Sequence, residues 1–287
     1  MHALAVIFSV CGAASNAAGT AFQRKAAAPM KSGGGLRFLL ALVRQPAWLL
    51  GIVGVVFAFI FQALALYNGP IALVQPLFVL ELPFALMIAG PLLHRRMPSA
   101  GWYGVTGVVL GLAALLGAAA PSGDQAFAPM TAWIPAIIGC YGLMVVAVLV
   151  ARVSTSSLVR AASLGSAAAV GNAMTAALIK SATGTLSDQG LAAFLSTWQT
   201  YGFAVTGIAA VLLLENALQA GSLAASQPAL TIGDATVSLL LGVTLFGESV
   251  RTGWWLAPEL LGLGLVCAGV IVLARAISRV QPRHPVQ

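Results

Sequence analysis

The sequence is poor in charge, in cysteine and in histidine, and each shortage excludes a class of protein. Charged residues make up 7% of the 287 residues, against about 25% in soluble domains, so a water-soluble globular protein is excluded. The three cysteines lie in apolar runs and are odd in number, which favours packing roles over disulfides. The three histidines have no metal-ligand neighbour at useful spacing, and no Ser-His-Asp set or phosphate loop is present. We therefore do not expect an enzyme.

Most of the remaining sequence is apolar, with 60% hydrophobic residues. The apolar runs are long enough for nine helices across a bilayer, which predicts an all-α membrane protein surrounded by lipid. The first run is predicted to be a retained span rather than a signal peptide, because basic residues follow it instead of preceding it. The predicted spans are residues 3–22, 48–67, 70–93, 101–120, 130–151, 161–179, 194–218, 221–246 and 254–274.

The basic residues lie in the short segments between spans, which indicates positive-inside bias and argues against nucleic-acid binding. With the N-terminus outside and the C-terminus in the cytoplasm, twelve of the fourteen Lys and Arg residues are inside, and Lys180 and Arg251 are outside. We therefore predict a multi-pass protein of the cell (inner) membrane. Residues 36–45 are too short to cross it, and are predicted to lie on its surface or to re-enter it.

The two halves of the chain repeat one design. Residues 69–76 and 221–228 match at an offset of 152, and each segment ends in Gln-Pro and is followed by an acid. Asn16 and Asn172 correspond at an offset of 156. Since the fifth span separates four spans from four, the halves run in opposite directions. We predict an inverted repeat of spans 1–4 and 6–9 joined by span 5, with divisions at 1–129, 130–152 and 153–287.

Several polar side chains lie within the predicted spans, where a bare charge would cost about 2.5–3.5 kcal/mol. Gln62 precedes Glu81 by 19 residues, and Glu215 precedes Asp234 by the same 19. Interrupted helices around a mid-membrane site in inverted repeats are typical of secondary transporters. The predicted substrate or coupling-ion residues are Glu81, Asp234, Gln62, Glu215, Gln75, Gln227, Asn16 and Asn172, and the predicted helix breaks are at Pro76, Pro83 and Pro228. By contrast, Glu248 and Glu259 are expected to be solvated at span boundaries.

Three functions remain open on this evidence. Two carboxylates with amide oxygens suit Mg²⁺ or another divalent cation, which makes Glu81 and Asp234 candidate metal ligands; the same acids can carry a coupling H⁺. A proton-coupled exporter of a small metabolite or drug is the alternative, and its apolar pocket would use Phe57, Phe61, Phe78 and Phe84. In a non-transporting scaffold or lipid-binding protein, the polar groups would only hold helices together. No resident cofactor is predicted, and the sequence is compatible with a homodimer.

Short motifs also resemble a known family. Residues 66–96 and 218–248 resemble the third and fourth helices of repeats in the drug/metabolite transporter (EamA-like) superfamily. Phe246-Gly247-Glu248 resembles the end of such a helix, Ser15-Asn16 resembles the Gly-Ser-Asn signature, and Leu93-His94-Arg95 departs from the pattern. A basic loop replaces one helix of the first repeat, a layout similar to NIPA-type magnesium transporters, whose Leu-Val-Thr-Pro-Leu segment resembles residues 73–77. The resemblance implies a transporter that works by alternating access and, through NIPA, magnesium as its cargo.

Overall fold

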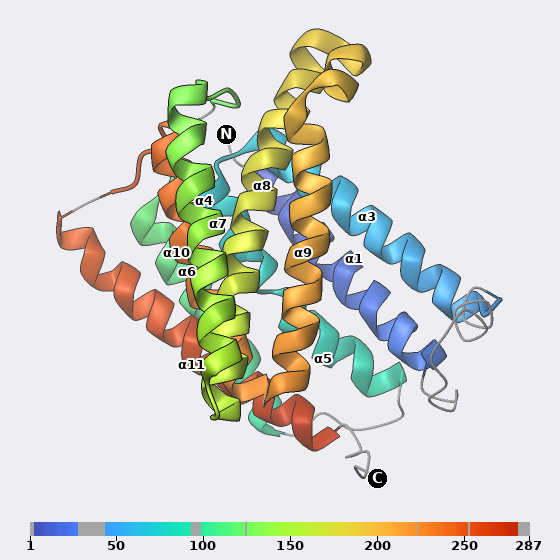
Figure 1. Ribbon diagram of the computed structural model, residues 1–287. Helices are drawn as coiled ribbons and strands as arrows, with labels where there is room; N and C mark the ends of the chain where they lie inside the picture. The colour runs from blue at the N-terminus through green and yellow to red at the C-terminus, as the bar shows by residue number, and fades with distance from the viewer. Residues whose placement is uncertain are drawn as a thin grey trace.

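The computed structural model describes residues 3–27, 44–92, 99–123, 125–221, 223–251 and 253–280. These ranges form a helical bundle (Figure 1) with nine segments long and apolar enough to cross a membrane. Within them, the only β pairing is an isolated bridge between Ser122 and Ser249. An all-α protein of multi-pass membrane type is therefore confirmed, while most of the predicted surface or re-entrant stretch, 36–45, lies outside the described residues.

The helices follow the predicted spans closely. In chain order they are α1 (Ala3–Ala27), α3 (Pro46–Asn68), α4 (Ile71–Phe78), α5 (Glu81–Leu92), α6 (Ser99–Ala119), α7 (Met130–Val153), α8 (Ser157–Ser196), α9 (Trp198–Ala220), α10 (Leu223–Phe246), the 3₁₀ helix η1 (Gly253–Trp255) and α11 (Leu256–Val280). Together α4 and α5 form the third span. We call the end of the bundle that carries Asn68, Met130 and Phe246 the upper end, as in Figure 1, and the end that carries Val153 and Ala220 the lower end.

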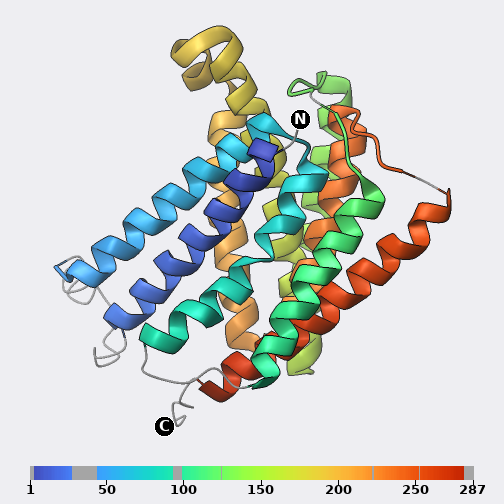
Figure 2. The same ribbon diagram turned by 180° about the vertical axis from the view of Figure 1, so that it is seen from behind.

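The helices pack in two groups that meet along α4 and α10. Helix α1 packs against α3, α4 and α5, and α8 packs against α7, α9 and α10. Helix α6 pairs with α11, which Figure 2 shows from behind. This pair has backbone-to-backbone contact, since a Cβ added to Gly262 would lie 2.5 Å from the backbone nitrogen of Leu115. Small residues permit such close approach, which is how helices associate in lipid without a hydrophobic driving force.

Helix α8 is the central helix of the second group. Its middle is rich in Ala and Gly, and most residues from Gly165 to Thr185 are buried. Around its upper half, the buried Trp133 ring meets Phe246 edge-on at 6.3 Å and Trp198 at 5.2 Å between centroids. Small side chains on all faces of α8 let neighbouring helices surround it.

Residues 181–193, which separate the predicted spans 161–179 and 194–218 and were expected to form a loop, are helical, which corrects that expectation. Helix α8 continues through them to a sharp turn at Gly190, whose φ of 82° suits glycine. Thr183 and Thr185 hydroxyls donate to the carbonyls of Ile179 and Ser181. Polar side chains that bond to their own helix are compatible with helical structure, so a polar composition alone did not mark a loop here. The segment projects beyond the upper end of the bundle (Figure 1).

The third span is interrupted at the turn residues Val79 and Leu80, between two of the prolines expected to break a helix. The N–H of Val79 donates to the carbonyl of Pro76, and the N–H of Leu82 donates to that of Val79, both at 3.1 Å. Pro83 has no N–H to continue the helical pattern.

The third expected break, at Pro228, is absent, because Pro228 lies within a continuous α10. The residue at the offset of 152 from Pro83 is Ala235. The second half therefore has one proline where the first half has two, and a single proline near the start of a span leaves the helix continuous.

Candidate functional site

A cavity of about 550 Å³ lies between the two helix groups. Six of the eight predicted site residues line it, each from a different helix. They are Asn16 (α1), Gln62 (α3), Gln75 (α4), Glu81 (α5), Asn172 (α8) and Asp234 (α10). Side chains that are up to 218 positions apart in the sequence thus face one hollow, and both halves of the chain contribute to it.

Gln75 connects the polar groups of the two halves. It is 3% exposed, and its Oε1 accepts from Gln62 Nε2 at 3.4 Å. Its Nε2 donates to Asp234 Oδ1 at 3.5 Å and to the Asn172 carbonyl at 3.4 Å. Ser238 Oγ donates to the same Asp234 oxygen at 3.3 Å. These four bonds are longer than usual hydrogen bonds and are therefore weak.

The helix break determines where Glu81 lies. Glu81 is the first residue of α5 and is half-buried at the cavity. The N–H groups of Leu82 and Phe84 already donate to the carbonyls of Val79 and Leu80, so it is the partial positive charge of the helix start that favours a carboxylate there. The interruption therefore places both an acid and a helix N-terminus inside a membrane span.

The rest of the cavity wall is mainly apolar and aromatic. Phe59 and Phe203 line it, and their rings meet at 5.6 Å between α3 and α9. Of the four phenylalanines predicted for an apolar pocket, Phe78 lines the cavity; Phe57, Phe61 and Phe84 are not in its lining. Sequence reasoning missed Phe59 and Phe203, because several phenylalanines on each apolar helix are equivalent until the helix's rotation is known.

Two predicted site residues lie outside the cavity. Glu215 is exposed on α9, about one helical turn below Val211, which lines the cavity. Gln227 is buried and lies about two turns below Asp234 on α10. The equal spacing of the Gln62–Glu81 and Glu215–Asp234 pairs therefore does not produce equal positions.

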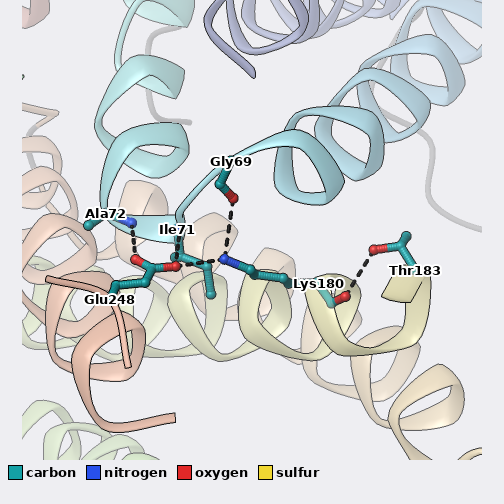
Figure 3. A network of polar contacts seen from close by, with 6 residues as sticks. All are labelled: Gly69, Ile71, Ala72, Lys180, Thr183 and Glu248. Carbon is teal, nitrogen blue, oxygen red and sulfur yellow. Dashed lines mark hydrogen bonds and ion pairs between the residues drawn. The ribbon is translucent and has the colours of Figure 1, made fainter. Parts of the chain in front are cut away.

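The structure contradicts the expectation that Glu248 is solvated. Lys180 Nζ lies 2.7 Å from Glu248 Oε1, and the two side chains are 3% and 0% exposed. Glu248 also accepts the backbone N–H groups of Ile71 at 2.7 Å and Ala72 at 3.0 Å, so it caps the start of α4 (Figure 3). Lys180 Nζ donates in addition to the carbonyl of Gly69 at 3.3 Å.

This cluster joins α8, the start of α4 and the end of α10 at the upper end of the bundle. A tight turn allows it: Gly247 has a φ of 59°, and the Glu248 N–H returns to the carbonyl of Gly242. A signal for this pair was present in the sequence, since Lys180 directly follows the apolar span predicted at 161–179, and a lysine next to an apolar span favours a charged partner. Glu259, the other acid expected at a boundary, is half-buried in the first turn of α11.

The geometry defines a helical protein of multi-pass membrane type, with a polar cavity between two helix groups. In comparisons with known proteins, the chain is 28% identical over 280 residues to an uncharacterized protein of Corynebacterium glutamicum. The alignment covers 96% of this chain and 95% of that protein, so the similarity extends over nearly the whole of both. No family model and no solved structure matches the chain.

Proposed function

We propose that the protein is a secondary transporter of the drug/metabolite transporter type, and that the cavity is its substrate site. The observation that carries this proposal is the convergence of six polar residues from six helices, Glu81 and Asp234 among them, on one hollow. Polar groups in membrane spans are costly and are retained mainly for function. A scaffold would not need an open cavity where they meet.

The packing pattern supports an inverted repeat. Helices α1, α3, α4–α5 and α6 would correspond to α8, α9, α10 and α11, with α7 as the connector. Under this correspondence, the α1–α3 contact matches the α8–α9 contact, and the contacts of α1 with α4 and α5 match that of α8 with α10. The α4–α10 and α6–α11 pairs join equivalent elements of the two halves. Rocking of one half against the other would then expose the cavity alternately on each side.

The distribution of charge supports a cytoplasmic lower end. The lower end carries most of the described basic residues: Lys25, Arg44, Arg152, Arg160 and Arg275. At the upper end, Lys180 is neutralised by Glu248, so it adds no free charge there. This arrangement supports an inner-membrane transporter whose C-terminus lies in the cytoplasm.

The cavity suits a small organic solute with a positive charge better than a bare metal ion. Its volume is within the range of about 300–1,000 Å³ for small-molecule sites. Phe59, Phe78 and Phe203 offer apolar area and ring faces for a cation, while Glu81 and Asp234 supply opposite charge and proton coupling. Mg²⁺ is the second candidate, favoured by the two carboxylates.

Uptake into proteoliposomes under an imposed pH gradient tests the proposal. Organic cations and Mg²⁺ are offered separately to the wild type and to Glu81→Gln, Asp234→Asn and Glu215→Gln. We expect gradient-driven flux of an organic cation that falls at least tenfold in the two cavity variants. Glu215→Gln is the matched control, an acid of the same bundle outside the cavity, and should retain flux. Mg²⁺ flux alone would select the second candidate; unchanged flux in both cavity variants would refute the assigned site.

A further inference from the structure

A second hollow runs along the outside of the bundle between α7 and α9. Its upper part, about 350 Å³, is lined by α7 residues from Tyr141 to Arg152 and by Leu213 of α9. Apart from Arg152 and the Tyr141 hydroxyl, the side chains that line this part are apolar. Its lower part, about 400 Å³, adds Arg160 and Asn216. The two parts share Val148, Arg152 and Leu213, so they form one continuous groove with an apolar upper part and a basic lower part.

This groove, which we call the α7–α9 groove, faces away from the transport cavity. No described residue lines both. Val145 and Leu149 in its wall are 57% and 53% exposed, and Figure 1 looks onto this face of α7 and α9. The hydroxyls of Tyr141 and Thr206 hydrogen-bond between the two helices at its top. The groove therefore ends at a defined depth rather than running the full length of the bundle.

The length of the α7–α9 groove matches one leaflet of a bilayer. Tyr141 and Arg152 are 11 residues apart on α7, which corresponds to about 16 Å along the helix. Half of the hydrocarbon core is about 15 Å thick. The apolar part thus extends from the lower membrane surface to near the midplane, which is the extent of one acyl chain.

The lower end of the groove carries two arginines, Arg152 and Arg160. Arg152 and Arg160 are exposed, and neither forms an ion pair with any residue that the structure describes. Guanidinium groups bind phosphate through paired N–H donors, and basic pockets between helices at the cytoplasmic surface suit anionic lipid head groups. A zwitterionic lipid would bring its own cation into the pocket and would leave the two arginines unbalanced.

We propose that the α7–α9 groove binds one anionic glycerophospholipid from the lower leaflet. The phosphate lies between Arg152 and Arg160, and one acyl chain follows Val148 and Met144 towards Tyr141. The site is independent of the proposed transport activity, because it uses neither the cavity nor its residues. It places a lipid where α7, the connector between the two halves, meets α9.

Native mass spectrometry of the purified full-length protein tests this proposal, with dioleoyl phosphatidylglycerol and dioleoyl phosphatidylcholine as probes. We expect one tightly retained phosphatidylglycerol and weaker binding of phosphatidylcholine. Arg152→Gln/Arg160→Gln should weaken phosphatidylglycerol binding about 25-fold, from the usual contribution of two surface basic residues. Lys25→Gln/Arg44→Gln removes two exposed charges from the same end of the bundle and should change binding less than twofold.

A third variant separates the groove from simple charge attraction. Val148→Trp fills the shared part of the groove and leaves the charge unchanged, so it should also displace phosphatidylglycerol. Melting temperatures without added lipid establish that each variant is folded. Equal binding of the two lipids by the wild type, equal loss in the Lys25/Arg44 control, or unchanged binding by Val148→Trp would each overturn the proposal.

Discussion

The buried pair of Lys180 and Glu248 offers the sharpest test of the tertiary structure. We consider Glu248→Gln, which removes the negative charge and keeps nearly the same shape. The change leaves the ammonium of Lys180 at 3% exposure, with the carbonyl of Gly69 and the Phe246 ring, 5.0 Å away at its centroid, as its remaining described partners. It also weakens the cap on the N–H groups of Ile71 and Ala72.

Removing one partner of a buried ion pair typically destabilises a protein by about 3–5 kcal/mol, because the other charge is left uncompensated. We expect a loss of about 4 kcal/mol for Glu248→Gln. Lys180→Met should cost less, about 2–3 kcal/mol, since Glu248 keeps its two N–H donors. The double variant should be more stable than the sum of the singles implies, by about 2 kcal/mol of coupling.

Reversible unfolding in mixed detergent micelles measures these free energies, and the four proteins form a double-mutant cycle. Asp188→Asn is the control, because Asp188 is an exposed acid at the same end of the bundle; its effect should be within about 0.5 kcal/mol. If Glu248→Gln is as mild as Asp188→Asn, or if the two single effects simply add, Glu248 is not buried against Lys180 and the arrangement in Figure 3 is wrong.

Two further predictions concern the helices. Gly262→Ala should destabilise the protein by about 1–3 kcal/mol, because the added Cβ would lie 2.5 Å from the Leu115 backbone nitrogen. Gly264→Ala on the same helix is the control and should be neutral in the same unfolding assay, since a Cβ there would meet nothing within 4 Å. Equal effects of the two variants would contradict the α6–α11 contact. Pro83→Ala should allow α4 and α5 to join into one continuous helix, which would move Glu81 and lower transport at least tenfold. Pro228→Ala, within the continuous α10, should have little effect on transport. Equal loss of transport in both variants would show that the break does not position Glu81.

The spans could be assigned from the sequence because a lipid environment restricts which backbone structures can form. A backbone without water must satisfy its own hydrogen bonds, so apolar runs of sufficient length become helices. The nine predicted spans therefore have counterparts in the structure, with boundaries shifted by a few residues except at the end of α8, which continues from the predicted 179 to Ser196. The error at 181–193 arose where the chain leaves the apolar zone and polarity no longer separates helix from loop.

The sequence predicted most residues of the candidate site, but not how they are arranged. Asp234 and Gln75 could be predicted as site residues because a polar side chain within an apolar span must avoid lipid. Their meeting at 3.5 Å across 159 residues of sequence depends on how α4 and α10 are rotated. The same rotation brings Phe203 into the cavity wall, while Glu215 lies beyond the cavity's lower limit.

The sequence by itself determined the lipid environment, the helical class, the nine spans and the set of polar residues that must avoid lipid. These properties follow from the hydropathy of successive residues, which is known from the order of residues alone. Only the tertiary structure decided which polar residues share the cavity and that Lys180 pairs with Glu248. It also decided that two arginines lie at the lower end of the α7–α9 groove. Such contacts depend on helix rotation and close packing of small residues, and an apolar helix surrounded by lipid has no hydrophobic face to reveal its rotation in advance.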